Sequence, residues 1–138
     1  MATYTKYNPF VEELAKATHN FSAHTFKVAL SNGTPSAAHT TLSAITELST
    51  ANGYTAGGAT TTIGISEASG TVTVTATDPA AWTASGAGIT FRYAVLYNDT
   101  ATSPADALIA YWDNGSSTTV TSGNTLQVDF GATLFTLA

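Results

Sequence analysis

The sequence predicts an all-β protein: an antiparallel β-sandwich of the jelly-roll or tulip-like kind, with a short helix at its N-terminus. Three observations support this fold class. Apolar and polar residues alternate along several short segments, turn-forming Asn, Gly and Pro residues separate these segments, and about seven or eight such segments follow one another at short spacing. The 138 residues have the length of one domain, and no repeat or linker divides them.

The first predicted element is a helix that begins at Asn8. Asn8 is a suitable cap, Pro9 suits the first helical position, and Glu12 and Glu13 lie near the positive end of the helix dipole. An apolar stripe runs along the helix at helical spacing, formed by Phe10, Leu14, Ala17 and Phe21. Because a helix of about twelve residues is marginal in isolation, it must pack on the β body or on a neighbouring subunit.

The strand pattern begins only after this helix, so we predict a helical arm over residues 1–22 and a β-sandwich domain over residues 23–138. We expect the arm to act in assembly and not in the β core. Its candidate partner-binding residues are Phe10, Val11, Leu14 and Phe21.

The first half of the β region contains three predicted strands. Residues 24–31 alternate Phe26, Val28 and Leu30 with polar or small residues, and a turn follows at residues 32–35. Residues 41–50 are rich in Thr and Ser, and we predict a loop with one helical turn there. Two further strands are predicted at residues 60–66 and 70–77, the second with a row of threonines that we expect to face solvent.

The second half, from Ile89 to Phe130, has the clearest strand signal. Phe91, Tyr93, Val95 and Tyr97 fall on one face of a strand, and Leu126, Val128 and Phe130 alternate in the same way. Asn114-Gly115, between strand segments, predicts a hairpin turn. A last segment at residues 133–137 is expected to pair as an edge strand.

Charge and composition exclude several classes of function. The formal net charge is −5, and three of the four basic residues lie within the first 27 residues, so the cationic cluster that nucleic acid requires is missing. No stretch approaches the roughly 18 apolar residues of a membrane span, and the N-terminus does not have the pattern of an export signal. The lack of cysteine fits folding in a reducing cytoplasm.

No residue pattern indicates catalysis, a metal or a cofactor. The three histidines, His19, His24 and His39, do not have the spacing of a zinc site. Asp113-Asn114-Gly115 lacks the further ligands of a calcium loop. Nucleophile elbows, Walker loops and dinucleotide fingerprints are missing as well, so we expect a protein that is not an enzyme.

The aromatic residues of the strands allow two interpretations. They either fill the core or a subunit interface, which we favour, or form a platform on which sugar rings stack. The residues concerned are Trp82, Tyr93, Tyr97, Tyr111 and Trp112.

Four segments carry a resemblance to known proteins, namely HTFKVALSNGTP, ITELSTANGYTAGG, FRYAVLYNDT and DALIAYWDNGSSTTVTSGNTLQVDF. They resemble a family of small tailed-bacteriophage virion proteins that includes capsid decoration (cement) proteins, and the likeness runs from about Tyr7 to the C-terminus. The resemblance implies a β-sandwich or tulip-like module on the outer surface of the capsid, made in the host cytoplasm and released by lysis. Its expected partners are the major capsid protein and further copies of itself, as a homotrimer.

A second reading stays open, in which the chain is a tail, head-fibre or baseplate module that touches host glycans. The family has no catalytic motif that can be compared residue by residue. The two readings therefore differ in partner and in location on the particle, and neither calls for a cofactor.

Overall fold

The computed structural model describes residues 2–138 and shows an all-β fold with one short N-terminal helix and antiparallel sheets. Strands make up 48% of the chain, so the helix is a minor addition to a β protein. The elements are β1 (Thr3–Lys6), α1 (Asn8–Ala15), β2 (Phe26–Ser31), the 3-10 helix η1 (Leu42–Ala44), β3 (Ala59–Thr61), β4 (Ile63–Ala68), β5 (Thr71–Ala76), β6 (Trp82–Thr83), β7 (Ile89–Thr102), β8 (Ala105–Val120), β9 (Thr125–Leu126) and β10 (Phe135–Leu137).

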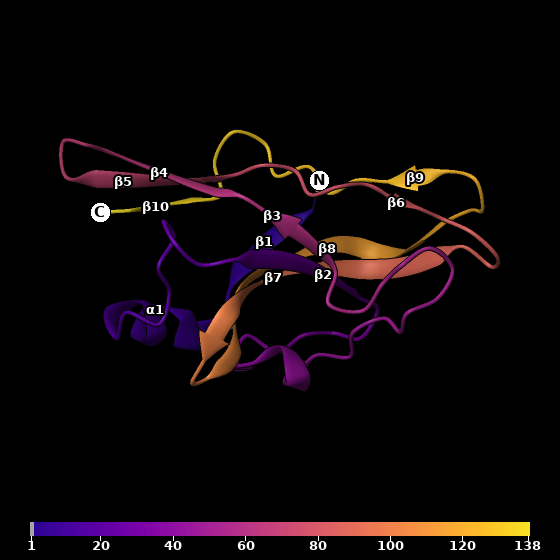
Figure 1. Ribbon diagram of the computed structural model, residues 1–138, viewed down its shortest axis with the longest axis horizontal. Helices are drawn as coiled ribbons and strands as arrows, with labels where there is room; N and C mark the ends of the chain where they lie inside the picture. The colour runs from indigo at the N-terminus through magenta and orange to yellow at the C-terminus, as the bar shows by residue number, and fades with distance from the viewer. Residues whose placement is uncertain (1) are drawn as a thin grey trace.

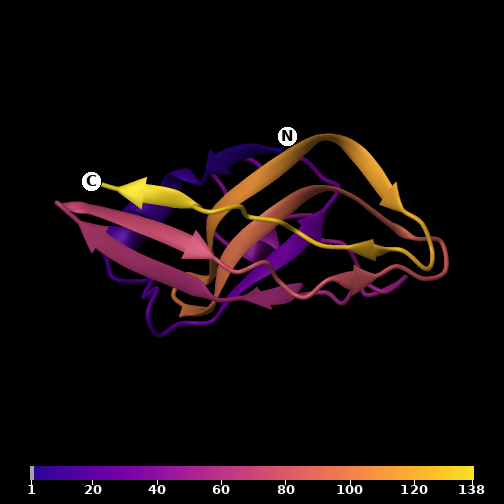
Figure 2. The same cartoon turned by 90° about the horizontal axis from the view of Figure 1, so that it is seen from above.

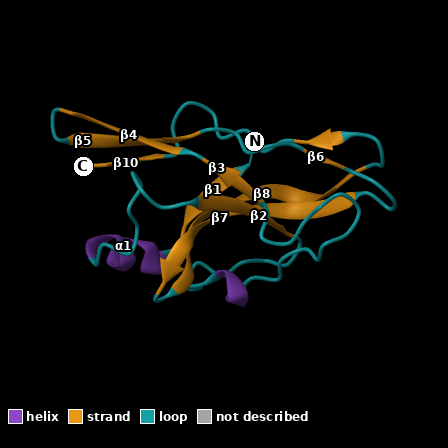
Figure 3. Ribbon diagram, in the orientation of Figure 1, coloured by secondary structure: helices purple, strands orange, loops and turns teal. Residues whose placement is uncertain are grey.

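The largest sheet has five strands in the order β1-β8-β7-β2-β3, and every pairing in it is antiparallel. The long hairpin of β7 and β8 forms its centre. Two smaller sheets, β10-β5-β4 and β6-β9, form a second layer on one side of it. Helix α1 and η1 lie on the other side (Figure 1; Figure 3).

The chain changes sheet at Thr62, between β3 and β4. β3 pairs with β2 in the large sheet, while β4 pairs with β5 in the small one. Thr77 holds this crossing, because its backbone N–H donates to the carbonyl oxygen of Thr62 at 2.9 Å and its hydroxyl accepts from the N–H of Thr62 at 3.1 Å. From there the hairpin of β4 and β5 projects past one end of the five-stranded sheet (Figure 2).

The core includes both faces of the central strands. Val28, Ala29 and Leu30 are consecutive in β2 and completely buried, although successive side chains point to opposite faces of a strand. The same holds for Val95 and Leu96 in β7. Layers on both sides of the large sheet therefore exclude water from it.

Residues 2–22 are joined to this core. β1 pairs with β8 from Thr3 opposite Asp113 to Lys6 opposite Ala110, and Tyr7 and Phe10 are 0% and 1% exposed. The prediction of a helical arm over residues 1–22, apart from a β-sandwich domain over residues 23–138, therefore differs from the observed pairing and burial. Met1 lies outside the described residues.

The helix is shorter than its apolar stripe indicated. It ends at Ala15, Ala17 has a positive φ of 63°, and Phe21 lies beyond it in a loop. Tyr7, and not Asn8, occupies the cap position, without a side-chain hydrogen bond. Phe21 still packs beside Phe10, with ring centroids 6.3 Å apart, but the loop after the helix brings it there and the helix does not.

The prediction of a hairpin turn at Asn114-Gly115 was wrong. Both residues lie within β8, where Phe91 is opposite Thr118 and Tyr93 is opposite Asp113, so that residues 114–117 bulge out of the ladder. Gly115, at φ 86°, relieves the backbone there, and its N–H donates to Asp113 Oδ1. The turn between β7 and β8 lies at Ser103-Pro104 instead, between the paired residues Thr102 and Ala105.

The predicted strand of Leu126, Val128 and Phe130 is only partly regular. β9 ends at Leu126, and the N–H of Phe130 donates to the carboxylate of Asp78 at 2.9 Å instead of joining a ladder. The alternating pattern nevertheless predicted the burial of these side chains correctly, since Phe130 is buried and Leu126 and Val128 pack against the core. The expected final edge strand is confirmed as β10, and the expected helical turn in residues 41–50 as η1.

Candidate functional site

The four candidate partner-binding residues do not form one exposed stripe. Phe10 is fully buried and its ring contacts Phe135 of β10, with centroids 5.5 Å apart. Leu14 and Phe21 are half-buried and pack against the core. Only Val11, which is 51% exposed, is open to a partner.

A buried polar cluster ties the segment after α1 to the central sheet. Its centre is Asn98 of β7, which is completely buried. The Asn98 amide nitrogen lies 3.2 Å from the carbonyl oxygen of Thr18, 3.2 Å from His19 Nδ1 and 3.0 Å from His24 Nδ1. Its Oδ1 accepts from the N–H groups of Thr100 and Ala101. One side chain thus holds a loop and a strand that are about eighty residues apart in the chain.

The two hydrogens of the Asn98 amide face three neighbours, namely the carbonyl oxygen of Thr18 and the Nδ1 atoms of His19 and His24. Nε2 of His19 is buried and has no hydrogen-bond partner among the described residues. Burial, opposed in part by the nearby carboxylate of Glu13, lowers the pKa of His19 from 6.5 to about 4. The positive charge of His24, when present, lowers this pKa further. His19 is therefore a neutral structural residue at neutral pH.

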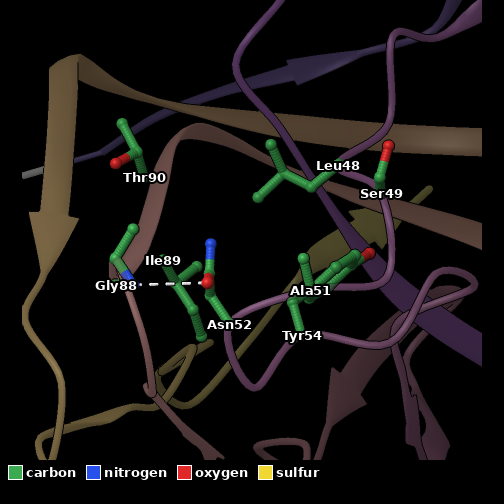
Figure 4. Close-up of a pocket in the computed structure, with 9 residues that line it drawn as sticks. Leu48, Ser49, Ala51, Asn52, Tyr54, Gly88, Ile89 and Thr90 are labelled. Atoms are coloured by element: carbon green, nitrogen blue, oxygen red, sulfur yellow. Dashed lines mark hydrogen bonds between the residues drawn. The ribbon is translucent and has the colours of Figure 1, made fainter.

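A cleft of about 300 Å³ lies between residues 48–54 and the beginning of β7 (Figure 4). Asn52 and Gly53 form a tight turn with φ values of 54° and 93°, bridged by Ala51 and Tyr54. Asn52 Oδ1 accepts from the N–H of Ala87 at 3.3 Å, which joins this turn to the turn that precedes β7. Glycine is required at position 53 because a Cβ atom there would overlap with the carbonyl oxygen of Thr83.

The lining of this cleft is neutral. Leu48 and Ile89 supply apolar contacts, and Ser49, Asn52 and Thr90 supply hydroxyl and amide groups. The Tyr54 hydroxyl is already engaged, since it donates to Glu47 at 2.7 Å and accepts from the N–H of Leu30 at 3.0 Å. Burial raises the pKa of Tyr54, so this phenol stays protonated. The cleft therefore offers hydrogen bonds but no acid, base or nucleophile for chemistry.

A smaller hollow of about 170 Å³ lies where residues 126–129 cross the large sheet. Arg92 borders it and donates from Nε and Nη2 to the two carboxylate oxygens of Asp113 at 2.8 and 2.9 Å. The Arg92 hydrogen bonds, with the N–H of Gly115, lower the pKa of Asp113. Because the guanidinium is already satisfied by a carboxylate, it is poorly placed to bind an anionic ligand.

Titratable side chains do not gather into a metal site in the part of the chain that the structure describes. Residues 2–138 contain no group of three His, Asp or Glu residues placed to hold an ion. His39 lies apart from the other two histidines, with its Nδ1 accepting from the N–H of Ser36 at 3.3 Å. In the same residues, neither helix is long enough to cross a bilayer.

The aromatic residues are mostly in the core, as the favoured interpretation holds. Trp82, Tyr93 and Tyr97 are 6%, 2% and 2% exposed, so their rings are not available for stacking with sugars. Tyr111 and Trp112 are half-buried against the core, and the ring of Trp112 lies 5.0 Å from that of Phe130. A sugar platform made of these five residues is therefore not present.

Few large apolar side chains are exposed. Among the described residues, the large hydrophobic side chains with substantial exposure are Tyr4, Val11 and Ile65. They belong to three different elements, β1, α1 and β4, and α1 and β4 lie in different layers of the molecule (Figure 1). Ile65, which is 50% exposed, is on the strand that ends the small sheet β10-β5-β4.

Sequence reasoning missed two features of this site. The role of Asn98 could not be predicted, because it depends on the three-dimensional contact with Thr18, His19 and His24. The open edge of β4 was also missed, although a strand was predicted at residues 60–66. A period-two pattern identifies a strand but does not reveal which of its edges is left unpaired.

Comparison with known proteins identifies no relative. No protein-family model, no curated protein and no solved structure matches the chain. Functional inference therefore rests on the chain's own surfaces.

Proposed function

We propose that this protein is a bacteriophage capsid decoration protein that binds the outer surface of the head and stabilises contacts between major capsid subunits. The family resemblance of four segments suggests the class. The observation that carries the proposal is the free edge of β4, where the side chain of Ile65 is about half exposed. Solvated apolar side chains of this size beside an unpaired strand favour contact with another protein.

The rest of the surface suits a static binding role. The clefts are lined by neutral or already paired groups, and charged residues make up only 9% of the chain, so most of the surface is hydroxyl-bearing or small. A contact made through such a surface depends on apolar burial and neutral hydrogen bonds. Moderate salt should therefore not detach the protein from particles.

A homotrimer is the assembly that this function favours. Heads offer three-fold positions at which one small clamp can bridge several subunits, and closed cyclic symmetry buries a patch without polymerisation. Light scattering of the isolated protein measures the order of assembly directly.

Cryo-electron microscopy of virions tests the proposal. The protein, labelled at its N-terminus, should appear on the outer head surface at symmetric positions, and heads that lack it should release DNA at a lower temperature. Label confined to the tail or baseplate would replace the proposal with the alternative of a tail, head-fibre or baseplate module. An unlabelled particle would contradict both.

A further inference from the structure

Residues 18–24, in the loop that follows α1, reach the large sheet through a single side chain. In the part of the chain that the structure describes, their hydrogen bonds to that sheet all end on Asn98 of β7. The Asn98 amide nitrogen lies within 3.2 Å of the Thr18 carbonyl oxygen and of Nδ1 in both His19 and His24. Its Oδ1 accepts from two backbone N–H groups of β7, which fixes the amide with its nitrogen toward the loop. One donor group on the sheet therefore holds three acceptors on the loop.

Protonation of either histidine turns one of these acceptors into a donor. A neutral imidazole has one unprotonated nitrogen, whereas an imidazolium carries hydrogen on both nitrogens and can only donate. On His24, a hydrogen at Nδ1 would face two donors, the Asn98 amide at 3.0 Å and the backbone N–H of Asn20 at 3.4 Å. On His19, it would face the same amide at 3.2 Å, while the buried Nε2 has no partner among the described residues. The closed loop therefore disfavours the charged form of both rings.

The charged groups around His19 do not remove this conflict. Glu13 of α1 is the carboxylate that favours a charge on His19. Its Oε2 already accepts from the Thr18 hydroxyl at 2.6 Å, and Nζ of Lys16 lies 3.7 Å from its Oε1. Burial outweighs the attraction of Glu13 and lowers the pKa of His19 to about 4, and a charge on His24 acts in the same direction.

His24 lines a hollow of about 210 Å³ that lies between residues 21–25 and residues 60–63. The other side chains of this lining are apolar or carry hydroxyl groups, and none is charged. On β7, the carboxylate of Asp99 is already paired with Nζ of Lys27 at 2.9 Å. Water in the hollow can therefore deliver a proton to His24, and no carboxylate of the lining stabilises the resulting charge.

We propose that residues 18–24 form a pH-sensitive latch, in which protons on His24 and His19 set these rings against the Asn98 amide and release the loop from β7. The strands beneath the loop have a buried core of their own, so both sheets stay paired when it opens. The loop closes again when the rings are neutral. The latch works within one chain and goes beyond the proposed function, because it does not need a capsid.

Phe21 joins the latch to the apolar core. Its ring lies parallel to that of His19, with 6.2 Å between the centroids and 7° between the planes. The same ring packs against Phe26 and Phe135, with centroids 5.3 Å and 6.1 Å away. Release of the loop exposes these rings to solvent, so a dye that binds exposed apolar surface reports the open form.

Opening of the loop is linked to proton uptake. The pKa of a solvated histidine is about 6.5, whereas the pKa of His19 in the closed loop is about 4 because of burial. The open form therefore binds more protons in this range, and opening becomes more favourable as the pH falls from 6.5 toward 4. The contribution of His19 alone raises the opening constant about twentyfold between pH 7 and pH 5.

Amide hydrogen exchange of the free protein at pH 7 and pH 5, corrected for the intrinsic effect of pH on exchange, measures this opening. We expect the opening constant of residues 18–24 to rise at least about tenfold. Residues 94–97, which are buried in β7, report global unfolding. Low concentrations of urea should accelerate their exchange and leave that of residues 18–24 almost unchanged, because an opening loop exposes little surface. An opening constant that does not depend on pH, or equal urea dependence in the two segments, would overturn the latch.

Glutamine variants identify the groups that titrate. His19→Gln and His24→Gln each replace a ring of the latch by a side chain that takes up no proton, so each should reduce the rise in the opening constant at least about threefold. His39→Gln is the matched control, because His39 lies apart from this cluster, with its Nδ1 accepting from the N–H of Ser36. The full rise should persist in this control. A full rise in all three variants would assign the pH dependence to other groups and contradict the proposal.

Asn98→Asp tests the direction of the switch. A carboxylate keeps the two hydrogen bonds at Oδ1, but its second oxygen accepts where the amide nitrogen donates. The variant therefore favours the charged rings, and its loop should open less at pH 5 than at pH 7. If Asn98 only packs, the loop of the variant should still open more at pH 5, and that result would overturn the inference. If Asn98→Asp does not fold, the glutamine variants decide the question alone.

Discussion

The five-stranded sheet and the small sheet β10-β5-β4 share antiparallel pairing but differ in how far they are covered. In the large sheet, five of the six residues of β2 are buried, and layers lie on both of its sides. In the small sheet, the last four residues of β4 are all exposed, and the outer edges of both β4 and β10 are unpaired. Stability of the fold therefore resides mainly in the large sheet, while the small sheet retains surface for contacts.

The largest expected effect comes from removing residues 1–22, which tests whether the N-terminal segment belongs to the stable region. The deletion removes β1 together with the buried rings of Tyr7 and Phe10. Losing a buried aromatic ring costs about 3–5 kcal/mol, so the two together approach the 5–15 kcal/mol that typically separates folded from unfolded domains. Circular dichroism of the truncated chain should show no cooperative thermal transition.

A point variant provides the control for this deletion. Val11→Ala changes an exposed side chain of the same segment and should leave the melting temperature nearly unchanged. A truncated chain that melts cooperatively near the temperature of the full chain would restore the view of a separable arm.

Two glycines allow a matched comparison of the two sheets. Gly58 and Gly70 have similar positive φ values of 74° and 83°, so alanine is equally strained at both. At Gly58, however, a Cβ atom would overlap with the carbonyl oxygen of Val28 in the central sheet, whereas at Gly70, at the tip of the β4–β5 hairpin, it would meet nothing. Gly70→Ala should cost about 1–2 kcal/mol, and Gly58→Ala clearly more, because the backbone must move.

Urea denaturation measures both variants in one series. Equal losses in the free energy of unfolding would mean that the close approach of Gly58 to β2 is relaxed at little cost. The contrast between the two sheets would then be weaker than their burial indicates.

The sequence was sufficient for the fold class because periodicity reports local burial. The alternation of Phe26, Val28 and Leu30 located β2, and the predicted strand at residues 70–77 contains β5. The predicted strand at residues 60–66 overlaps the end of β3 and the first part of β4, which continues to Ala68. The alternating pattern could not show that Ala29 and Ser31 are buried as well. Small residues occur both on a strand face that is exposed to solvent and on a face that is closely covered by another layer. The predicted solvent exposure of the threonines in β5 failed for a related reason, as they are half-buried.

Features that depend on contacts distant in the sequence could not be predicted. Asn114-Gly115 has the composition of a hairpin turn, but the pairing of residues 118–120 with residues 89–91 extends the strand past it. Phe10 fits the pattern of an amphipathic helix, but the pattern does not show what covers the apolar face of that helix. Phe10 contacts Phe135 of β10, which lies more than a hundred residues away in the sequence, so the face packs within this chain. Local patterns identify elements, and only the topology assigns their partners.

Acid should weaken the junction between the helix and the large sheet. The unfolded chain takes up a proton on His19 near pH 6.5, whereas the folded protein does so only near pH 4, because burial lowers the pKa of this side chain. The unfolded state therefore binds more protons between these values, and stability present above pH 6.5 is lost as the pH falls toward 4. Between pH 7 and pH 5 the melting temperature should fall by about 3–6 °C more than in His19→Gln.

Calorimetry of both proteins at pH 7, 6 and 5 measures this difference. His19→Gln keeps a polar side chain that does not titrate, so the carboxylates shared by both proteins cancel in the comparison. If the melting temperatures of the two proteins depend on pH in the same way, the folded protein accepts a proton on His19 without loss of stability. The nearby carboxylate of Glu13 would then stabilise the charged ring.

The smallest expected effect is at Ile65 of the small sheet, and its directly paired neighbour Val74 provides the comparison. Val74 is completely buried, so Val74→Ala removes apolar contacts and should lower the free energy of unfolding by about 1–3 kcal/mol. Ile65 is half exposed at the open edge, so Ile65→Thr, which keeps a β-branched side chain, should lower it by less than about 0.5 kcal/mol. Both are measured by urea denaturation of the free protein. A decrease in the free energy of unfolding at Ile65 as large as that at Val74 would mean that Ile65 stabilises the fold itself. A small decrease would mean that the Ile65 side chain contributes little to the fold and can be buried by a partner.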